Sequence, residues 1–170
     1  MDQAARSVAE ALFAAIRAES DGHSFYKMAA TSAQDEKGRQ VFEQLASEEL
    51  EHKRLLTAQY RAVTQTGTID PTVKLGAPAD LSGASPIFSE HIKARLKDAH
   101  FEMSALSIGI QLELGSMNYY REQAAQMSDA GVKRFFEELA EWEKGHYEAL
   151  LRQQDSLKDD YWYGGGFSPF

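Results

Sequence analysis

Four glutamates and two histidines form the same pattern twice in this chain. Each half carries one glutamate followed by a Glu-x-x-His motif, and every residue of the second set lies 94 positions after its counterpart. The six residues are Glu19, Glu49 and His52 in the first half and Glu113, Glu143 and His146 in the second. Carboxylate and imidazole groups are suitable ligands for iron and manganese ions. The pattern therefore predicts two matching halves of one metal site.

Hydrophobic residues at helical spacing surround these six positions. Around Glu19, for example, Leu12, Ile16, Tyr26 and Ala30 follow steps of three and four, which place them on one face of a helix. The same periodicity runs through most of the chain and predicts four long helices, over 3–31, 35–65, 103–127 and 129–157. Further matches at the same offset, such as Phe42 with Phe136, indicate an internal duplication.

The spacing to the turns brings the six residues to one level. The first turn centres near Gln34, which is 15 residues from each glutamate of its hairpin. The second centres near Ser128, also 15 residues from each of its glutamates. Asp35 and Asp129 follow these turns and are predicted to cap the next helices. Because antiparallel helices with equal counts to a shared turn align their side chains, we expect one convergent site.

The connection between the halves predicts the topology. Residues 66–86 are rich in glycine, proline and serine, and such a segment is long enough to run back along the bundle. The sequence therefore predicts an all-α, ferritin-like four-helix bundle. It consists of two hairpins, over 3–65 and 103–157, which a long crossover over 66–102 joins. A short helix is expected at 88–98 and an aromatic, docked tail at 158–170, within a single domain spanning 1–170.

Charge balance indicates a pair of metal ions. Four buried carboxylates without counter-charges would be very costly, and they would take up protons instead. Two divalent cations would supply four positive charges and leave both imidazoles neutral. Two alternatives remain at this stage: the acids lie on solvated helix faces, or the bundle has lost its metal.

Four segments resemble the rubrerythrin-like di-iron proteins of the ferritin-like superfamily. They are AESDGHSFYKMA, SEELEHKRLL, QLELGSMNYYREQA and AEWEKGHYEALL. The resemblance implies that the six residues bind two iron ions, with Glu49 and Glu143 bridging; manganese or mixed metals are alternatives. Typical members also carry a rubredoxin domain with cysteine ligands, and this sequence has no cysteine. Typical members also carry a further glutamate three residues beyond the ligand on the third helix, and that position is Ser116 here. The redox-linked exchange of metal ligands that is attributed to this glutamate is therefore in doubt for this chain.

Other residues near the predicted site have more than one interpretation. His23 lies one turn beyond Glu19 and is either an extra ligand or a hydrogen-bonded core histidine. Tyr26 and Tyr120 lie two turns beyond their glutamates. They either pack and make one hydrogen bond, or support catalysis by bonding a ligand carboxylate or relaying an electron. The remaining histidines, His91 and His100, are expected at the surface.

The predicted activity is that of a di-iron oxidoreductase. It would reduce hydrogen peroxide or dioxygen with electrons from an external donor, such as a rubredoxin or another reductase, in a role linked to oxidative stress. The alternatives are a ferritin-like protein for iron handling, a di-metal hydroxylase and a manganese catalase. A net charge of −8 argues against nucleic-acid binding, and no apolar run is long enough for a membrane span. We expect a cytoplasmic homodimer or higher homo-oligomer.

Overall fold

Four long helices make up most of the described chain. The structure is a computed structural model that describes residues 2–76 and 100–164, with side chains through residue 157. The helices are α1 (Gln3–Ser32), α2 (Glu36–Thr66), α4 (His100–Gln126) and α5 (Ala130–Gly164). Helices α1 and α2 match their predicted ranges to within one residue at each end. The predicted all-α four-helix bundle is therefore confirmed.

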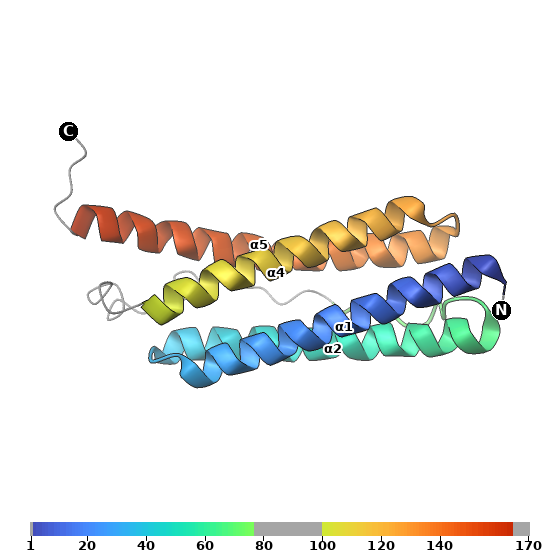
Figure 1. The fold of residues 1–170 in the computed structure, drawn as a ribbon, viewed down its shortest axis with the longest axis horizontal. Coiled ribbons are helices and arrows are strands. Elements are labelled where there is room, and N and C mark those ends of the chain that lie inside the picture. Colours follow the sequence, from blue (N-terminus) through green and yellow to red (C-terminus); the bar gives the residue numbers. More distant parts are fainter. Residues whose placement is uncertain (1, 77–99, 165–170) are drawn as a thin grey trace.

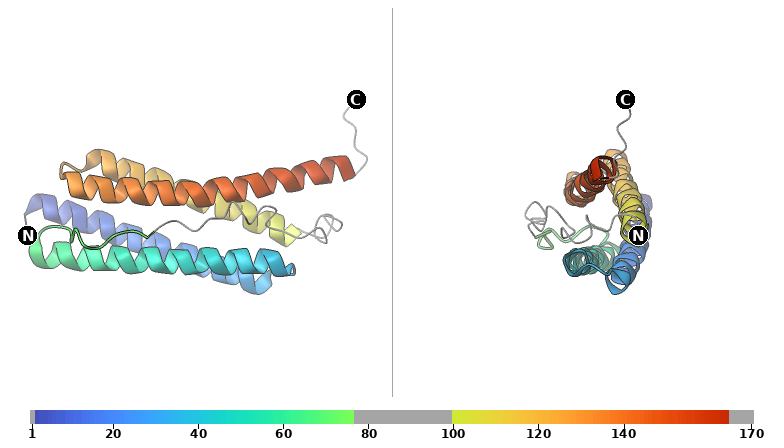
Figure 2. Two further views of the ribbon diagram at one scale, coloured as in Figure 1. Left: turned by 180° about the vertical axis from the view of Figure 1, so that it is seen from behind. Right: turned by 90° about the vertical axis from the view of Figure 1, so that its left-hand side faces the viewer.

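The helices form two antiparallel hairpins, whose turns lie at opposite ends of the bundle. Helix α1 packs along α2, α4 packs along α5, and a narrower contact joins α1 to α4. Helix α2 ends at the end of the bundle opposite to the start of α4, so these two helices run in the same direction (Figure 1). The end-on view in Figure 2 places α1 and α4 on one side of the bundle and α2 and α5 on the other. This is the topology expected for two hairpins joined by a long crossover.

The helix ends carry the predicted caps. The Asp35 carboxylate accepts a hydrogen bond from the Gly38 backbone N–H at 2.9 Å, and Asp129 accepts one from the Val132 N–H at 2.8 Å. Both bonds satisfy an amide that has no partner within its helix. Helix α2 is capped at its end by Gly67, whose φ of 84° lies in the left-handed region that glycine adopts without strain.

Two predicted boundaries are wrong. Helix α4 begins at His100 rather than at 103, because Glu102 in its first turn is buried and accepts a hydrogen bond from the Gln34 backbone N–H at 3.3 Å. Helix α5 continues to Gly164 instead of ending at 157, since residues 158–163 contain neither glycine nor proline. The predicted helix at 88–98, His91 and the end of the tail, 165–170, lie outside the described residues.

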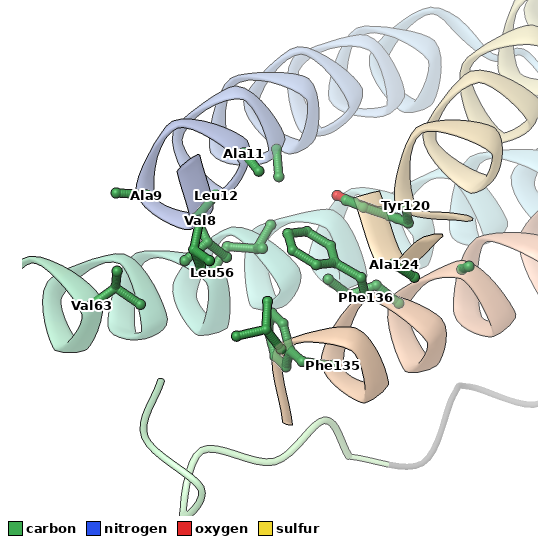
Figure 3. Close-up of a cluster of buried hydrophobic side chains, with 14 of the residues drawn as sticks. Val8, Ala9, Ala11, Leu12, Leu56, Val63, Tyr120, Ala124, Phe135 and Phe136 are labelled. Carbon is green, nitrogen blue, oxygen red and sulfur yellow. The ribbon is translucent and has the colours of Figure 1, made fainter. Parts of the chain in front are cut away.

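Two hydrophobic clusters fill the bundle above and below one polar layer. The first core cluster lies near the α1–α2 turn and includes Tyr26, Phe42, Leu45, Leu106 and Leu150. The second core cluster lies near the α4–α5 turn, and Figure 3 shows its side chains pointing toward one another from all four helices. Its main members are Val8, Leu12, Leu56, Val63, Tyr120, Phe135 and Phe136. All six predicted ligands fall between the two clusters along their helices.

None of the described helices is both long and hydrophobic enough to cross a lipid bilayer.

Candidate metal centre

All six predicted ligands are buried and converge in the polar layer. Each is 5% exposed or less. Their side-chain donor atoms fall into two groups, and within each group the atoms lie within 4.8 Å of one another. One group consists of Glu19, Glu49 and His52; the other consists of Glu49, Glu113, Glu143 and His146. Burial of all four acids excludes their placement on solvated helix faces.

Nδ1 of each histidine faces the carboxylates. His52 Nδ1 lies 3.3 Å from Glu19 Oε2 and 3.0 Å from Glu143 Oε1. His146 Nδ1 lies 3.5 Å from Glu113 Oε2 and 3.6 Å from Glu143 Oε2. Glu143 therefore presents one oxygen to each histidine, and Glu49 belongs to both donor groups. These positions suit the bridging roles that the resemblance implies for Glu49 and Glu143.

Two tyrosines hold the outer glutamates across the bundle. Tyr26 of α1 donates a hydrogen bond to Glu113 Oε1 on α4, and Tyr120 of α4 donates one to Glu19 Oε1 on α1. Burial, followed by the charge of the bonded glutamate, raises the pKa of each phenol well above 10. Both hydroxyl groups therefore stay protonated and act as fixed donors. Each tyrosine orients the glutamate of the opposite half.

Most metal-facing atoms of the cluster lack hydrogen-bond partners. Among the described residues, buried atoms without such a bond include Glu19 Oε2, both oxygens of Glu143, and Nδ1 of His52 and of His146. Unsatisfied buried polar atoms are rare in proteins because each carries a desolvation penalty. Here they are lone-pair donors directed at a common space. The donor set thus fits a pair of transition-metal ions.

With no metal bound, protons must balance the charge of the cluster. Burial and the neighbouring carboxylates raise the pKa of Glu49 well above its usual value. Burial and the charge of Glu143 raise the pKa of Glu113 to about 8. Burial alone would lower the pKa of His52, but the carboxylates of Glu143 and Glu19 outweigh it and raise the pKa to about 10. The same balance raises the pKa of His146, with Glu113 and Glu143 as the main partners.

A pocket between α1 and α4 leads to the cluster. Its volume is about 270 Å³, and its lining includes Asp21, Gly22, Glu49, Glu113 and Ser116. Its lining residues are mostly small or polar in type, but most of the surface that they expose to the pocket is apolar, so the space admits a small molecule without selecting for a polar one. Ser116 occupies the position at which the resemblance leads us to expect another glutamate. A serine there leaves open space beside the two carboxylates.

Gly22 keeps this pocket open beside Glu49. A Cβ atom at Gly22 would lie 2.9 Å from Glu49 Oε2, so Gly22→Ala must displace the carboxylate. We expect metal binding about tenfold weaker or more in this variant, measured by calorimetric titration. Gly115→Ala is the matched control, because Gly115 lines the same pocket but its Cβ would meet no atom within 4 Å.

The control should leave metal affinity unchanged and stabilise the helix by about 0.5–1 kcal/mol. Equal metal affinity in the two variants would contradict the proposed role of Gly22.

The other histidines lie outside the two donor groups. His23 is half-buried, and its Nδ1 bonds the Ala46 backbone oxygen at 2.7 Å, as expected for a hydrogen-bonded histidine. His100 is exposed.

Two residues that contact the site were not predicted from the sequence. One is Glu48, whose Oε2 lies 2.8 Å from His146 Nε2. The other is Trp142, whose ring lies against that of His52. A signal was present, since these two residues occupy equivalent repeat positions but differ in type.

Comparison with known proteins identifies the family. A family model described as Rubrerythrin matches residues 10–154, which include the whole buried cluster. No curated protein and no solved structure matches the chain. The match spans most of the sequence and agrees with both the fold and the donor set of the site. The chain therefore belongs to the rubrerythrin family of ferritin-like di-iron proteins.

Proposed function

We propose that the chain is a non-haem di-iron oxidoreductase that reduces hydrogen peroxide with electrons from an external donor. The observation that carries this proposal is a buried set of four carboxylates and two imidazoles, with unsatisfied donor atoms, that a small pocket reaches. Glu19, Glu49 and His52 would hold one ion, and Glu113, Glu143 and His146 the other. Glu49 and Glu143 would be shared between them.

The chemistry requires two electrons and two protons for each peroxide. The O–O bond breaks, both oxygens are reduced, and two water molecules form. When bound, two ferrous ions supply the electrons and polarise the peroxide oxygens. The protein excludes bulk water with the two core clusters and keeps Glu19 and Glu113 oriented through Tyr120 and Tyr26.

The size of the pocket is compatible with peroxide as the substrate. About 270 Å³ of space is ample for peroxide and a few waters, and acidic side chains reach it from Asp21, Glu49 and Glu113. Acidic walls disfavour anionic substrates and admit neutral molecules or cations. Because the chain contains no cysteine, the electron donor would be a separate molecule, such as a rubredoxin.

The test is the oxidation rate of the reduced protein. Protein loaded anaerobically with two Fe²⁺ per chain is mixed in a stopped-flow instrument with either hydrogen peroxide or dioxygen at equal concentration. We expect oxidation by peroxide to be at least about tenfold faster. Equal rates, or faster oxidation by dioxygen, would count against peroxide as the substrate. Repeated turnover that deposits many irons per chain would instead indicate an iron-handling protein.

A further inference from the structure

The two halves of the centre differ at the equivalent positions that lie against their histidines. The internal duplication relates His52 to His146 and Glu48 to Trp142, each pair separated by 94 residues. Both histidines turn Nδ1 toward the carboxylates, as described above. The surroundings of their other ring nitrogen, Nε2, are different in the two halves.

His146 is held by a carboxylate outside the cluster. Its Nε2 lies 2.8 Å from Glu48 Oε2, in a position to donate its proton to that oxygen. The Glu48 side chain is only 12% exposed, and its other oxygen accepts a hydrogen bond from Gln44 at 3.2 Å. A carboxylate at this position fixes the histidine tautomer, leaves the Nδ1 lone pair free for a metal, and makes Nδ1 more basic. Glu48 is thus a positioning residue for His146.

His52 has an aromatic ring where His146 has the carboxylate. The Trp142 ring lies edge-on, with its centroid 4.6 Å from that of His52. Trp142 is 8% exposed and His52 is fully buried, so the contact is well shielded from water. Within the described part of the chain, His52 Nε2 has no hydrogen-bond partner. On the Nε2 side of this imidazole, packing against Trp142 replaces the hydrogen bond, and no acceptor there increases the basicity of Nδ1.

The number of donor atoms also favours the metal position at His146. Four donor atoms converge around His146, and three converge around His52 under the same distance limit. From these observations we propose that the two metal positions are inequivalent. The position at His146 binds a divalent transition metal tightly, and the position at His52 is the weaker, exchangeable one. This inference rests on the proposed di-metal function, and Glu48 is the residue that sets the difference.

The direct test is a titration of the metal-free protein with Mn²⁺ alone. Calorimetry measures the two dissociation constants, and electron paramagnetic resonance distinguishes a single Mn²⁺ from a coupled pair. For the unmodified chain we expect two steps that differ by about 10- to 100-fold. The first equivalent should give the signal of isolated Mn²⁺, and the second should convert it to that of a coupled pair.

Substitution of Glu48 assigns the tighter step. Glu48→Gln keeps the shape of the side chain but removes its charge, and should weaken only the tighter step, by about tenfold or more. Glu51→Gln is the matched control, since Glu51 lies on the same helix but forms an exposed pair with Arg54. Trp142→Glu should tighten the weaker step by supplying His52 with the missing acceptor. Circular dichroism establishes that each variant is folded.

The outcomes separate this inference from the proposed function. Two equivalents bound with dissociation constants within threefold of each other would overturn the inequivalence and leave the di-metal proposal standing. An unchanged tighter step in Glu48→Gln would also overturn it. Binding of fewer than two metal ions by the unmodified chain would refute both.

Discussion

Replacement of Glu49 by alanine is expected to reduce the bound metal from two ions per chain to fewer than one. Glu49 belongs to both donor groups, so its loss removes an oxygen ligand from each metal position at once. Loss of a shared ligand should weaken binding by at least about 100-fold, since even loss of an outer hydrogen-bond partner costs about 10- to 100-fold. Elemental analysis after iron loading and desalting measures the change.

Glu51→Ala is the matched control for this experiment. Glu51 is exposed and bonds Arg54 on the surface of the same helix, two residues beyond Glu49. Surface ion pairs contribute little to stability, so this variant should retain both metals. Retention of two tightly bound ions by Glu49→Ala would show that Glu49 is not a bridging ligand.

Thermal unfolding gives a second measurement that does not depend on activity. A metal that binds only the folded protein stabilises it by about 2.7 kcal/mol at a free concentration of 100 times the dissociation constant. The unmodified chain and Glu51→Ala should therefore melt at higher temperature when iron is added under anaerobic conditions. In Glu49→Ala the added metal should have little effect on the melting temperature.

The sequence predicted the helical bundle and the convergence of the six residues because both follow from local spacing. The helical period fixes which side chains face inward, and equal counts to each turn fix their level. The same reasoning failed at Glu102, which belongs to α4 because of a contact with Gln34 from the other hairpin. Helix α5 also extends beyond 157, into the segment where the sequence predicts an aromatic tail.

Features that depend on how the hairpins dock were beyond reach of the sequence. The spacing indicated that Tyr26 and Tyr120 face inward, but only the packing of α1 against α4 shows that each bonds the glutamate of the opposite half. The pocket beside Glu49 and Glu113 depends on the same packing and on the absence of a side chain at Gly22. The contrast between Glu48 and Trp142 was visible as a mismatch in the repeat, but its meaning required the partners of each histidine.

Metal affinity is expected to rise steeply with pH. The pKa of His52 is raised to about 10 and that of Glu113 to about 8, and the pKa values of Glu49 and His146 are also raised. At pH 7 His52 and Glu113 hold protons when no metal is bound, and a metal ion can bind only their deprotonated forms. The raised pKa values of Glu49 and His146 act in the same direction. Two metal ions must then displace at least about two protons, so acid opposes binding and base favours it.

The expected slope is at least about tenfold in affinity per metal ion for each pH unit between about 6 and 8, because at least about one proton leaves for each metal bound. Above pH 8 the slope should decrease, since Glu113 then loses its proton before metal arrives. Calorimetric titration in two buffers of different ionisation enthalpy counts the released protons directly. Release of at least about two protons at pH 7 would show that protons neutralise the buried carboxylates until metal replaces them. Release of fewer than one would mean that the carboxylates and imidazoles are already deprotonated, and that the metal-free cluster is balanced in some other way.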